Sequence, residues 1–306
     1  MAIGDQVTAL GHVQLGELLL GRGTPYRWRS LSGWEDLPGL DSGSVNRADA
    51  HGAILGRLLA QPRVITLDGI LIRARRGEIG AVVQQLGAAT SVIDGEVPFV
   101  VQLDERGPLL AWVRATARAI PVERGYTLGT ITGAAVQLTA SDPRRYELLE
   151  RTARAGLPTA EPGLDWNTAE GGLDAGLDFN GESGLDFGPP GSTGTLTARN
   201  DGTAPAHPVV EFRGPVSLPS LTNLATGDVL EYDLDLAADD LLAVDTGAGT
   251  VTLNGTTSRL YTATARSVPE QSWALWPGTA DMAYRAAPGS SDPAASVAVR
   301  WRSAYW

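Results

Sequence analysis

The stretch VPFVVQLDERGPLLAWVRATARAIPV, residues 97–122, decides the fold class of the N-terminal half. It contains two extended runs rich in Val, Leu and aromatic residues, and residues 105–108 between them include the Gly-Pro pair typical of a turn. This pattern predicts a β-hairpin. The flanking sequence extends the β-rich pattern in both directions.

The segments on either side of the hairpin predict more strands and one helix. RVITLDGILIRA (63–74) alternates apolar residues as a strand does, and AAVQLTASDPRRYELLE (134–150) supplies another strand that ends at Asp142-Pro143. Between 63–74 and the hairpin, one face of a short helix is predicted by apolar residues at i, i+3, i+4 and i+7, namely Ile79, Val82, Val83 and Leu86. We therefore expect a mainly β domain with one short α-helix.

The C-terminal half predicts a β-sandwich. DVLEYDLDL (228–236) alternates apolar with acidic residues, so we expect one strand with an acidic solvent face. LLAVDTGAGTVTLNG (241–255) predicts a hairpin turning at Gly247–Gly249, followed by an Asn254-Gly255 turn. HPVVEFRG (207–214) and SVAVRWRSAYW (296–306) predict further strands. Several short strands at regular turn spacing are typical of a sandwich.

A change of charge and composition marks a domain boundary. Residues 1–158 hold 17 arginines against 16 acidic residues, whereas residues 159–306 hold 7 against 19. A Pro- and Gly-rich stretch begins near Gly156 and runs to FGPPGSTG (187–194). We predict an N-terminal domain over 1–156, a strap and connector over 157–195, and a C-terminal domain over 196–306.

Composition excludes several classes of function. All 24 basic residues are arginine, and the formal net charge of -11 argues against a nucleic-acid-binding face. Without lysine there is no P-loop or Schiff-base chemistry, and without cysteine there is no disulfide or thiolate site. No HExxH or GxSxG motif is present. We predict a protein that is not an enzyme, with no catalytic residue, metal or cofactor. No apolar run reaches the roughly 20 residues of a membrane span, so we expect no membrane insertion and a soluble product made in the cytoplasm.

Two alternative functions that depend on acidic residues remain open, calcium binding and glycoside hydrolysis. Asp233, Asp235, Asp239 and Asp240 are candidate calcium ligands, but no EF-hand spacing is present, and the solvent face of a strand explains them better. A β-rich glycosidase needs two carboxylates close in space, which sequence spacing does not reveal.

Tryptophans supply another alternative, a carbohydrate-binding or adhesin protein. Trp166, Trp273 and Trp276 all lie in the C-terminal half, and exposed tryptophans on a sandwich stack on sugar rings. Tryptophans at alternate strand positions are more often core or interface residues. The solvent exposure of these side chains in the folded protein distinguishes the two interpretations, because a sugar-stacking tryptophan must be exposed.

Several segments together resemble the distal tail proteins of siphophages, the ring-forming hub proteins of the tail tip. LTASDPRRYE (138–147) resembles the closing strand and Asp-Pro-Arg-x-Tyr segment of that family's N-terminal domain, and residues 41–72 are similar to the block before its helix. Residues 200–255, with LWPGTADMAYRA (275–286) and VAVRWRSAYW (297–306), resemble its C-terminal domain. The resemblance covers nearly the whole chain.

The resemblance implies a structural protein of the virion tail tip in a long, non-contractile tail. It implies a belt-type N-terminal β-sandwich that assembles into a homo-hexameric hub ring, and a galectin-like C-terminal β-sandwich. Its implied partners are the tail-tube protein on one side and the tail-associated lysin or hub protein on the other.

A physical argument supports the ring. A cyclic assembly needs two complementary patches on each subunit, and a nearly neutral first domain can surround an axis without accumulating repulsion. We expect the 97–123 hairpin and the 129–140 strand to supply contacts, with Trp112 and Val136 as candidate interface residues, although both positions also fit an ordinary domain core.

The phrase Gly-Leu-Asp-aromatic occurs three times within residues 163–187, at irregular spacing. Each copy pairs a turn residue with an apolar anchor, which favours a strap lying on a sandwich over a calcium site.

Overall fold

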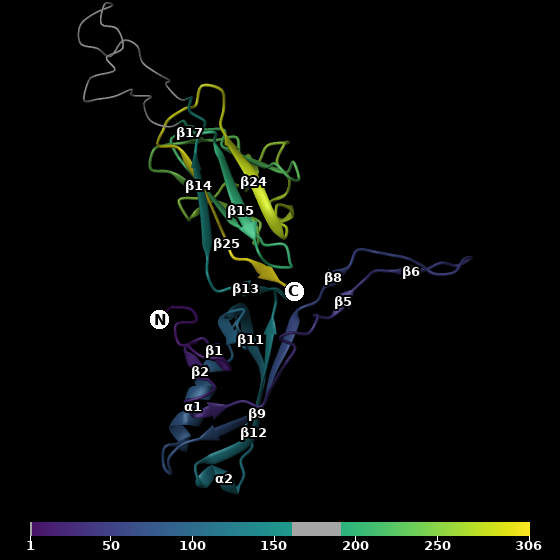
Figure 1. Ribbon diagram of the computed structural model, residues 1–306, viewed down its shortest axis with the longest axis vertical. Helices are drawn as coiled ribbons and strands as arrows, with labels where there is room; N and C mark the ends of the chain where they lie inside the picture. The colour runs from purple at the N-terminus through teal and green to yellow at the C-terminus, as the bar shows by residue number, and fades with distance from the viewer. Residues whose placement is uncertain (1, 161–190) are drawn as a thin grey trace, which may run out of the picture. The chain divides into compact units, whose positions relative to one another are not determined.

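The computed structural model describes residues 2–160 and 191–306, and it divides the chain into two compact units (Figure 1). The first unit is Met1–Leu149 with Ala304–Trp306, and the second is Glu150–Ser303. Our predicted boundary at residue 156 differs from this division, because β14 (Arg151–Gly156) pairs along its length with β25 (Ser296–Trp301) of the second unit. The predicted strap, with Trp166 and all three Gly-Leu-Asp phrases, lies outside the described residues.

One antiparallel sheet forms the frame of the first unit, in the order β2-β1-β10-β11-β12-β9-β3, with β4 on β9 and with β13 joining β11 to β26. The predicted hairpin of residues 97–122 is present as β10 and β11, and the 63–74 and 134–140 strands are present as β9 and β12. The strands of this sheet are β1 His12–Leu15, β2 Leu18–Leu20, β3 Tyr26–Arg27, β4 Ser30–Ser32, β9 Arg63–Arg73, β10 Val97–Gln102, β11 Leu109–Ala119, β12 Thr130–Ala140, β13 Arg145–Glu147 and β26 Ala304–Tyr305.

Two short strand pairs between β4 and β9 form a separate hairpin, which we call the arm (residues 36–62). β5 (Leu40–Asp41) pairs with β8 (Leu59–Ala60), and β6 (Val45–Asn46) pairs with β7 (Ala53–Ile54). Figure 1 shows the arm running out from the start of β9 as a narrow ribbon without a covering layer. The sequence analysis did not predict this element.

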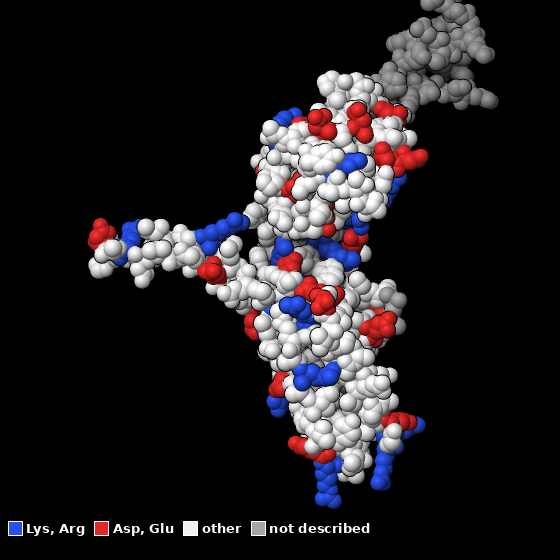
Figure 2. Space-filling model, turned by 180° about the vertical axis from the view of Figure 1, so that it is seen from behind, with Lys and Arg blue, Asp and Glu red and all other residues white. Residues whose placement is uncertain are grey.

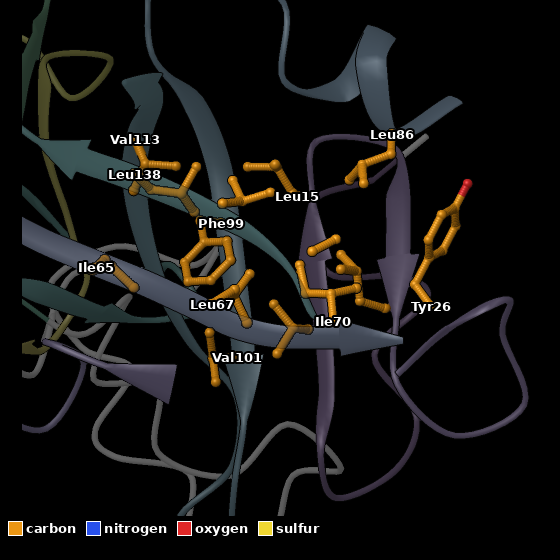
Figure 3. Close-up of a cluster of buried hydrophobic side chains, with 14 of the residues drawn as sticks. Leu15, Tyr26, Ile65, Leu67, Ile70, Leu86, Phe99, Val101, Val113 and Leu138 are labelled. Carbon is orange, nitrogen blue, oxygen red and sulfur yellow. The ribbon is translucent and has the colours of Figure 1, made fainter. Parts of the chain in front are cut away.

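The core of the first unit lies between the sheet and α1 (Ile79–Ala89) (Figure 3). Ile79 and Leu86 of the predicted helix face are buried, and Val82 and Val83 pack against the same core, so the predicted helix is confirmed. Arg118 of β11 donates to Gly87 O at 2.9 Å and to Thr90 Oγ1 at 2.6 Å. A cation at a helix C-terminus donates to carbonyls that lack a partner within the helix, and it interacts favourably with the helix dipole. Arg118 of the sheet therefore stabilises the C-terminal end of α1.

The second unit is a sandwich of two sheets, in the orders β14-β25-β16-β21-β22-β23 and β15-β24-β18-β19. Phe212 of β16 lies 5.9 Å from Tyr284 of β24 between ring centroids, so aromatic side chains from both sheets meet in the core. The strands not yet given are β15 Thr195–Asn200, β16 Val209–Arg213, β17 Val216–Ser217, β18 Ser220–Asn223, β19 Val229–Glu231, β20 Asp235–Leu236, β21 Leu241–Asp245, β22 Thr250–Leu253, β23 Thr257–Ser258 and β24 Gly278–Arg285. The short helices are α2 Arg124–Thr127 in the first unit, and the 3-10 turns η1 Leu260–Thr262 and η2 Glu270–Ser272 in the second.

Turn chemistry explains the predicted hairpin of the second unit. The Asp245 carboxylate accepts hydrogen bonds from the amides of Gly247 and Ala248, both at 2.9 Å, and closes the turn between β21 and β22. Asn254 and Gly255 both have positive φ, 52° and 74°, as an Asn-Gly hairpin turn requires. Both predicted turns are confirmed.

The predicted strand over residues 228–236 is wrong in two respects. It is divided into β19 and β20, which pair with different partners. Glu231, expected on an acidic solvent face, is buried and accepts from Thr264 Oγ1 at 2.8 Å and Arg266 Nη1 at 2.9 Å. A buried carboxylate is tolerated because these donors replace water, and the period-2 pattern carries no sign of them.

Tyr26 of β3 gives a test of the packing between sheet and helix. Its hydroxyl donates to Val82 O at 2.7 Å, and burial raises the pKa of Tyr26 to about 12. Tyr26→Phe should lower the free energy of unfolding by about 1 kcal/mol at pH 7.

The neutral phenol is the favoured form in the fold, so its contribution is complete below the unfolded-state pKa near 10 and is lost as pH rises from there towards 12. Urea unfolding at pH 7 to 12 should therefore show the deficit of Tyr26→Phe shrinking with pH. Tyr261→Phe, at an exposed tyrosine, is the matched control. A deficit independent of pH would contradict the assignment.

Candidate functional site

The root of the arm is held by a buried arginine. Arg63, the first residue of β9, is 1% exposed, and its Nη1 donates to the carbonyls of Gly33 at 2.8 Å, Trp34 at 3.1 Å and Asp36 at 2.6 Å. Its Nε donates to Pro143 O at 2.7 Å. Burial, with the nearby charge of Arg145, lowers the pKa of Arg63. The Arg63 side chain thus connects three parts of the chain: the residues that lead into the arm, the start of β9 that follows the arm, and the turn after β12.

Gly33 shows how closely the arm root is packed. Its φ is +79°, and a Cβ at this position would lie 1.9 Å from Val64 O. No side chain fits, so glycine is required where the chain leaves β4 for the arm.

The Asp-Pro-Arg-Arg-Tyr segment forms the other side of this root. Asp142 accepts from Arg144 Nε at 2.8 Å and from the Tyr146 hydroxyl. Burial and the charge of Asp142 raise the pKa of Tyr146 above its usual range. The Tyr146 ring meets Trp112 edge to face at a centroid distance of 5.7 Å. The segment singled out in the sequence is therefore a structural junction.

Arg145 completes the junction. It is buried, lies over the Trp34 ring at 5.6 Å, and places Nη1 2.9 Å from Glu35 Oε1. Its Nη2 donates to Trp306 O, so residues just before the arm, β13 and the last strand are joined by one guanidinium. Arginine suits this role because its planar fork donates in several directions.

Beyond this root the arm is exposed. Every arm residue except Pro38, Ala53 and Ala60 is exposed, and Val45 and Ile54 form a cross-strand pair at 65% and 63%. The exposed large apolar residues of the arm are Leu37, Leu40, Val45, Ile54, Leu55, Leu58 and Leu59.

This arrangement is typical of an interaction element. A two-stranded hairpin alone is marginally stable in water, and contiguous exposed apolar residues mark protein interaction sites. The free edges of the arm also offer unpaired backbone groups to a partner strand. The arm is our candidate functional site. Sequence reasoning missed it because its apolar residues, separated by Gly and Ser, follow no sustained period.

The two predicted interface residues have different environments. Trp112 is half-buried against Tyr146 at the edge of the junction. Val136 is 1% exposed and packs in the core of the first unit, so its side chain has no surface to offer a second subunit. The face of a strand that is buried depends on the sheet around it, which the isolated segment does not specify.

The three tryptophans considered as candidate sugar-stacking residues also differ in their environments. Trp273 is 0% exposed and donates to Asp228 O at 3.3 Å, which leaves no face for a sugar ring. Trp276 is 60% exposed. Trp166 lies outside the described residues.

The acidic residues in the described part of the chain do not form a metal centre. Within residues 2–160 and 191–306, no group of three or more His, Asp or Glu side chains could hold a metal ion. Asp240 instead accepts from Ala237 N and from Asn254 Nδ2, both at 2.9 Å, and so fixes a turn. Among the described residues, no helix is long and apolar enough to cross a membrane.

Comparison with known proteins finds a family model that is similar to part of this chain. Residues 201–305 match the family model described as the C-terminal domain of the siphovirus-type tail component. This match covers β16 to β26, which include the segments on which the resemblance of the C-terminal half was based. No curated protein matches the chain.

Solved structures show that the fold extends beyond that domain. The crystal structure of the SPP1 Dit protein, titled a paradigm of the hub adsorption apparatus in phages infecting Gram-positive bacteria, aligns with a TM-score of 0.64 at 10% identity. The alignment covers 96% of this chain and 99% of that one. The phage P2 baseplate in its activated conformation with Ca aligns with a TM-score of 0.48 at 12% identity, over 91% of each chain. The mainly β, two-unit fold is therefore shared with the SPP1 Dit protein over nearly the whole length of both chains.

The arm root can be tested by removing its buried guanidinium. Arg63→Met leaves four carbonyl acceptors without their donor, and we expect a loss of about 3 kcal/mol in the free energy of unfolding, measured in urea. Amide hydrogen exchange across residues 33–62 should accelerate. The control is Arg29→Met, because the Arg29–Asp68 pair is exposed and should contribute less than about 1 kcal/mol. Equal losses in the two variants would refute the role assigned to Arg63.

Proposed function

We propose that this chain is a non-enzymatic structural hub of a long non-contractile phage tail, in which copies assemble into a homo-hexameric ring at the tail tip. The tail-tube protein would bind one side of the ring and the tail-associated lysin or hub protein the other. The observation that carries the proposal is the arm, a rooted element with an exposed apolar surface on a fold shared with a phage hub protein.

The physical argument for a ring concerns the arm and the body that receives it. A ring closes when one patch of each subunit meets a different patch of the next. The arm and the body of the first unit supply two such different patches. The nearly neutral charge of residues 1–158 allows six copies to surround an axis without strong repulsion.

The direct experiment is the mass of the purified chain by light scattering, with negative-stain electron microscopy of the same peak. A hexamer of a 32.1 kDa chain has a mass of about 193 kDa, six times the monomer, and should show a central opening. A monomer at every concentration, also in the presence of isolated tail tubes, would refute the ring.

The role of the arm is tested by Leu55→Asp with Leu58→Asp. Both side chains are exposed in the isolated chain, so the melting temperature should change little, while unpaired carboxylates in a subunit contact cost several kcal/mol and should dissociate the ring. Val92→Asp, at a fully exposed loop position outside the arm, is the matched control. Trp112→Glu tests the predicted contact beside the arm root.

A ring that persists in the Leu55/Leu58 variant would show that the arm is not the assembly element. Dissociation of the Val92→Asp variant would show that added charge acts without regard to position. Circular dichroism on each variant establishes that the fold is intact.

A second function is favoured by one observation, the 60% exposure of Trp276 in the second unit. A tail-tip adhesin would stack a sugar ring on this side chain. Glycan-array binding that Trp276→Ala abolishes, with Trp112→Ala as control, would support it. Equal binding by both variants would remove Trp276 from consideration.

A further inference from the structure

The turn between β22 and β23 contains the one Asn-Gly pair in the described part of the chain. Asn254 and Gly255 are both exposed. The sequence contains six asparagines, and the other one that precedes a glycine is Asn180, outside the described residues. Glycine has no side chain to shield its backbone nitrogen, so an Asn-Gly pair offers the least steric resistance to attack on the asparagine side chain.

The reaction open to this pair is an intramolecular cyclisation. The Gly255 nitrogen attacks Cγ of Asn254, the bond from Cγ to Nδ2 breaks, and Nδ2 leaves as ammonia with the proton that Gly255 N gives up. Water then opens the five-membered imide at either carbonyl, which yields aspartate or isoaspartate. Water is the only co-reactant. Gly255 N donates to no acceptor among the described residues, so the attacking atom is not occupied.

The fold holds the Asn254 side chain by both of its polar atoms. Oδ1 accepts from Leu241 N at 2.9 Å, and Nδ2 donates to Asp240 Oδ1 at 2.9 Å. The backbone N of Asn254 also donates to Leu241 O at 2.8 Å. The side chain is therefore held against the start of β21, and it must leave both partners before Cγ can turn to the Gly255 nitrogen.

Asp240 is itself fixed in position. Its Oδ2 accepts from Ala237 N at 2.9 Å. Hydrogen bonds from Asn254 and Ala237, together with the charge of Arg259, lower the pKa of Asp240, so this carboxylate is ionised at neutral pH. A hydrogen bond to an ionised acceptor is stronger than one between neutral groups. Asp240 is therefore the main restraint on the Asn254 amide.

We propose that Asn254 is a deamidation site whose reaction is suppressed in the folded chain by its contacts with Asp240 and Leu241. The cyclisation proceeds when the turn opens and releases the amide. The overall reaction is irreversible, because ammonia is lost, so an opening of this turn that leads to reaction leaves a permanent chemical change. The site lies within the second unit, and the proposal does not depend on ring formation.

Deamidation would convert the contact with Asp240 from attraction to repulsion. The donor Nδ2 would be replaced by a carboxylate oxygen, so that two like charges would lie at hydrogen-bond distance. On the face drawn in Figure 2, acidic side chains of the second unit are interspersed with basic and uncharged ones, as on surfaces that avoid like-charge contacts. The product would introduce such a contact.

The altered turn would act on the edge of a sheet. β23 is the last strand of the six-stranded sheet and pairs only with β22, through Leu253 opposite Thr257 and Thr252 opposite Ser258. Isoaspartate places an additional carbon in the backbone of the turn that sets this register. We therefore expect β23 to lose its pairing first.

The experiment measures the deamidation rate at Asn254 in the folded chain at mildly alkaline pH, by tryptic mapping and mass spectrometry. Cleavage after Arg213 and Arg259 releases residues 214–259 as one peptide, which separates Asn254 from Asn180. A synthetic peptide of residues 250–259 provides the unrestrained rate. The folded chain should react at least about tenfold more slowly than this peptide, because a hydrogen bond to a charged group must first break.

Asp240→Ala removes the acceptor of the Asn254 amide and should raise the rate in the folded chain by at least about tenfold. The matched control is Asp239→Ala, which removes the same charge at an exposed neighbour that does not hydrogen-bond to Asn254. This control should leave the rate unchanged. Circular dichroism establishes that both variants are folded.

A measurement that does not depend on the reaction rate uses Asn254→Asp, which imitates the product. It should lower the melting temperature of the second unit by a few degrees. Adding Asp240→Asn restores one amide and one carboxylate to the pair and should recover most of the loss.

Three results would overturn the proposal. The folded chain could deamidate at Asn254 as fast as the peptide, or Asp240→Ala and Asp239→Ala could have equal rates. The third is a melting temperature that Asn254→Asp leaves unchanged, since the side chain would then have no contact with Asp240 that restrains it.

Discussion

The first unit depends on one buried cation at the place where the arm joins the sheet. Arg63 donates to four carbonyl oxygens from residues 33–36 and 143, which no backbone ladder satisfies. A buried carbonyl without a donor costs about 1–3 kcal/mol, and a buried guanidinium without acceptors costs more. The cation and the carbonyls are therefore stable only together. The path of the chain into and out of the arm follows from this mutual requirement.

The arm root and the arm have opposite chemistry. The root is dense in paired charges and aromatic rings, with Arg145 over Trp34 and Tyr146 against Trp112. The arm has exposed apolar side chains and no core of its own. A rigid root reduces the conformational entropy that a partner must remove on binding, so an arm held at its base binds more strongly than a free hairpin. Packing in the root would thus strengthen an interaction made by the arm.

The features that the sequence predicted and those that it missed differ in how far apart in the sequence the interacting residues lie. The 97–122 hairpin, the helix at Ile79 and the Asn254-Gly255 turn follow from periodicity and turn chemistry within a few residues, and all three were predicted. Glu231 has donors more than thirty residues away, and Val136 is buried by neighbouring strands. No local pattern shows such partners.

The arm root, at the candidate site, also depends on contacts that the local sequence does not predict. Arg63 was quoted in a strand segment, but nothing in RVITLDGILIRA indicates that its first side chain turns inward to residues 33–36. The Asp-Pro-Arg-Arg-Tyr segment was noticed because it resembles a family, not because its role could be worked out. Its partners Trp112 and Trp306 are distant in sequence, and only the folded sheet brings them together.

The strand β9 places two surfaces of different chemistry at its ends. Arg63 at its start anchors the apolar arm, and Arg73 at its end is exposed, as are Arg75 and Arg76 after it. An eleven-residue strand spans about 35 Å, several times the Debye length of about 8 Å at physiological salt. Charge at the Arg73 end is therefore screened from the arm, and substitutions at the two ends of β9 should act additively. Apolar contacts change little with salt, whereas contacts made through exposed arginines weaken as ionic strength rises. Ionic strength therefore distinguishes a contact made through the apolar arm from one made through the arginines at the other end of β9.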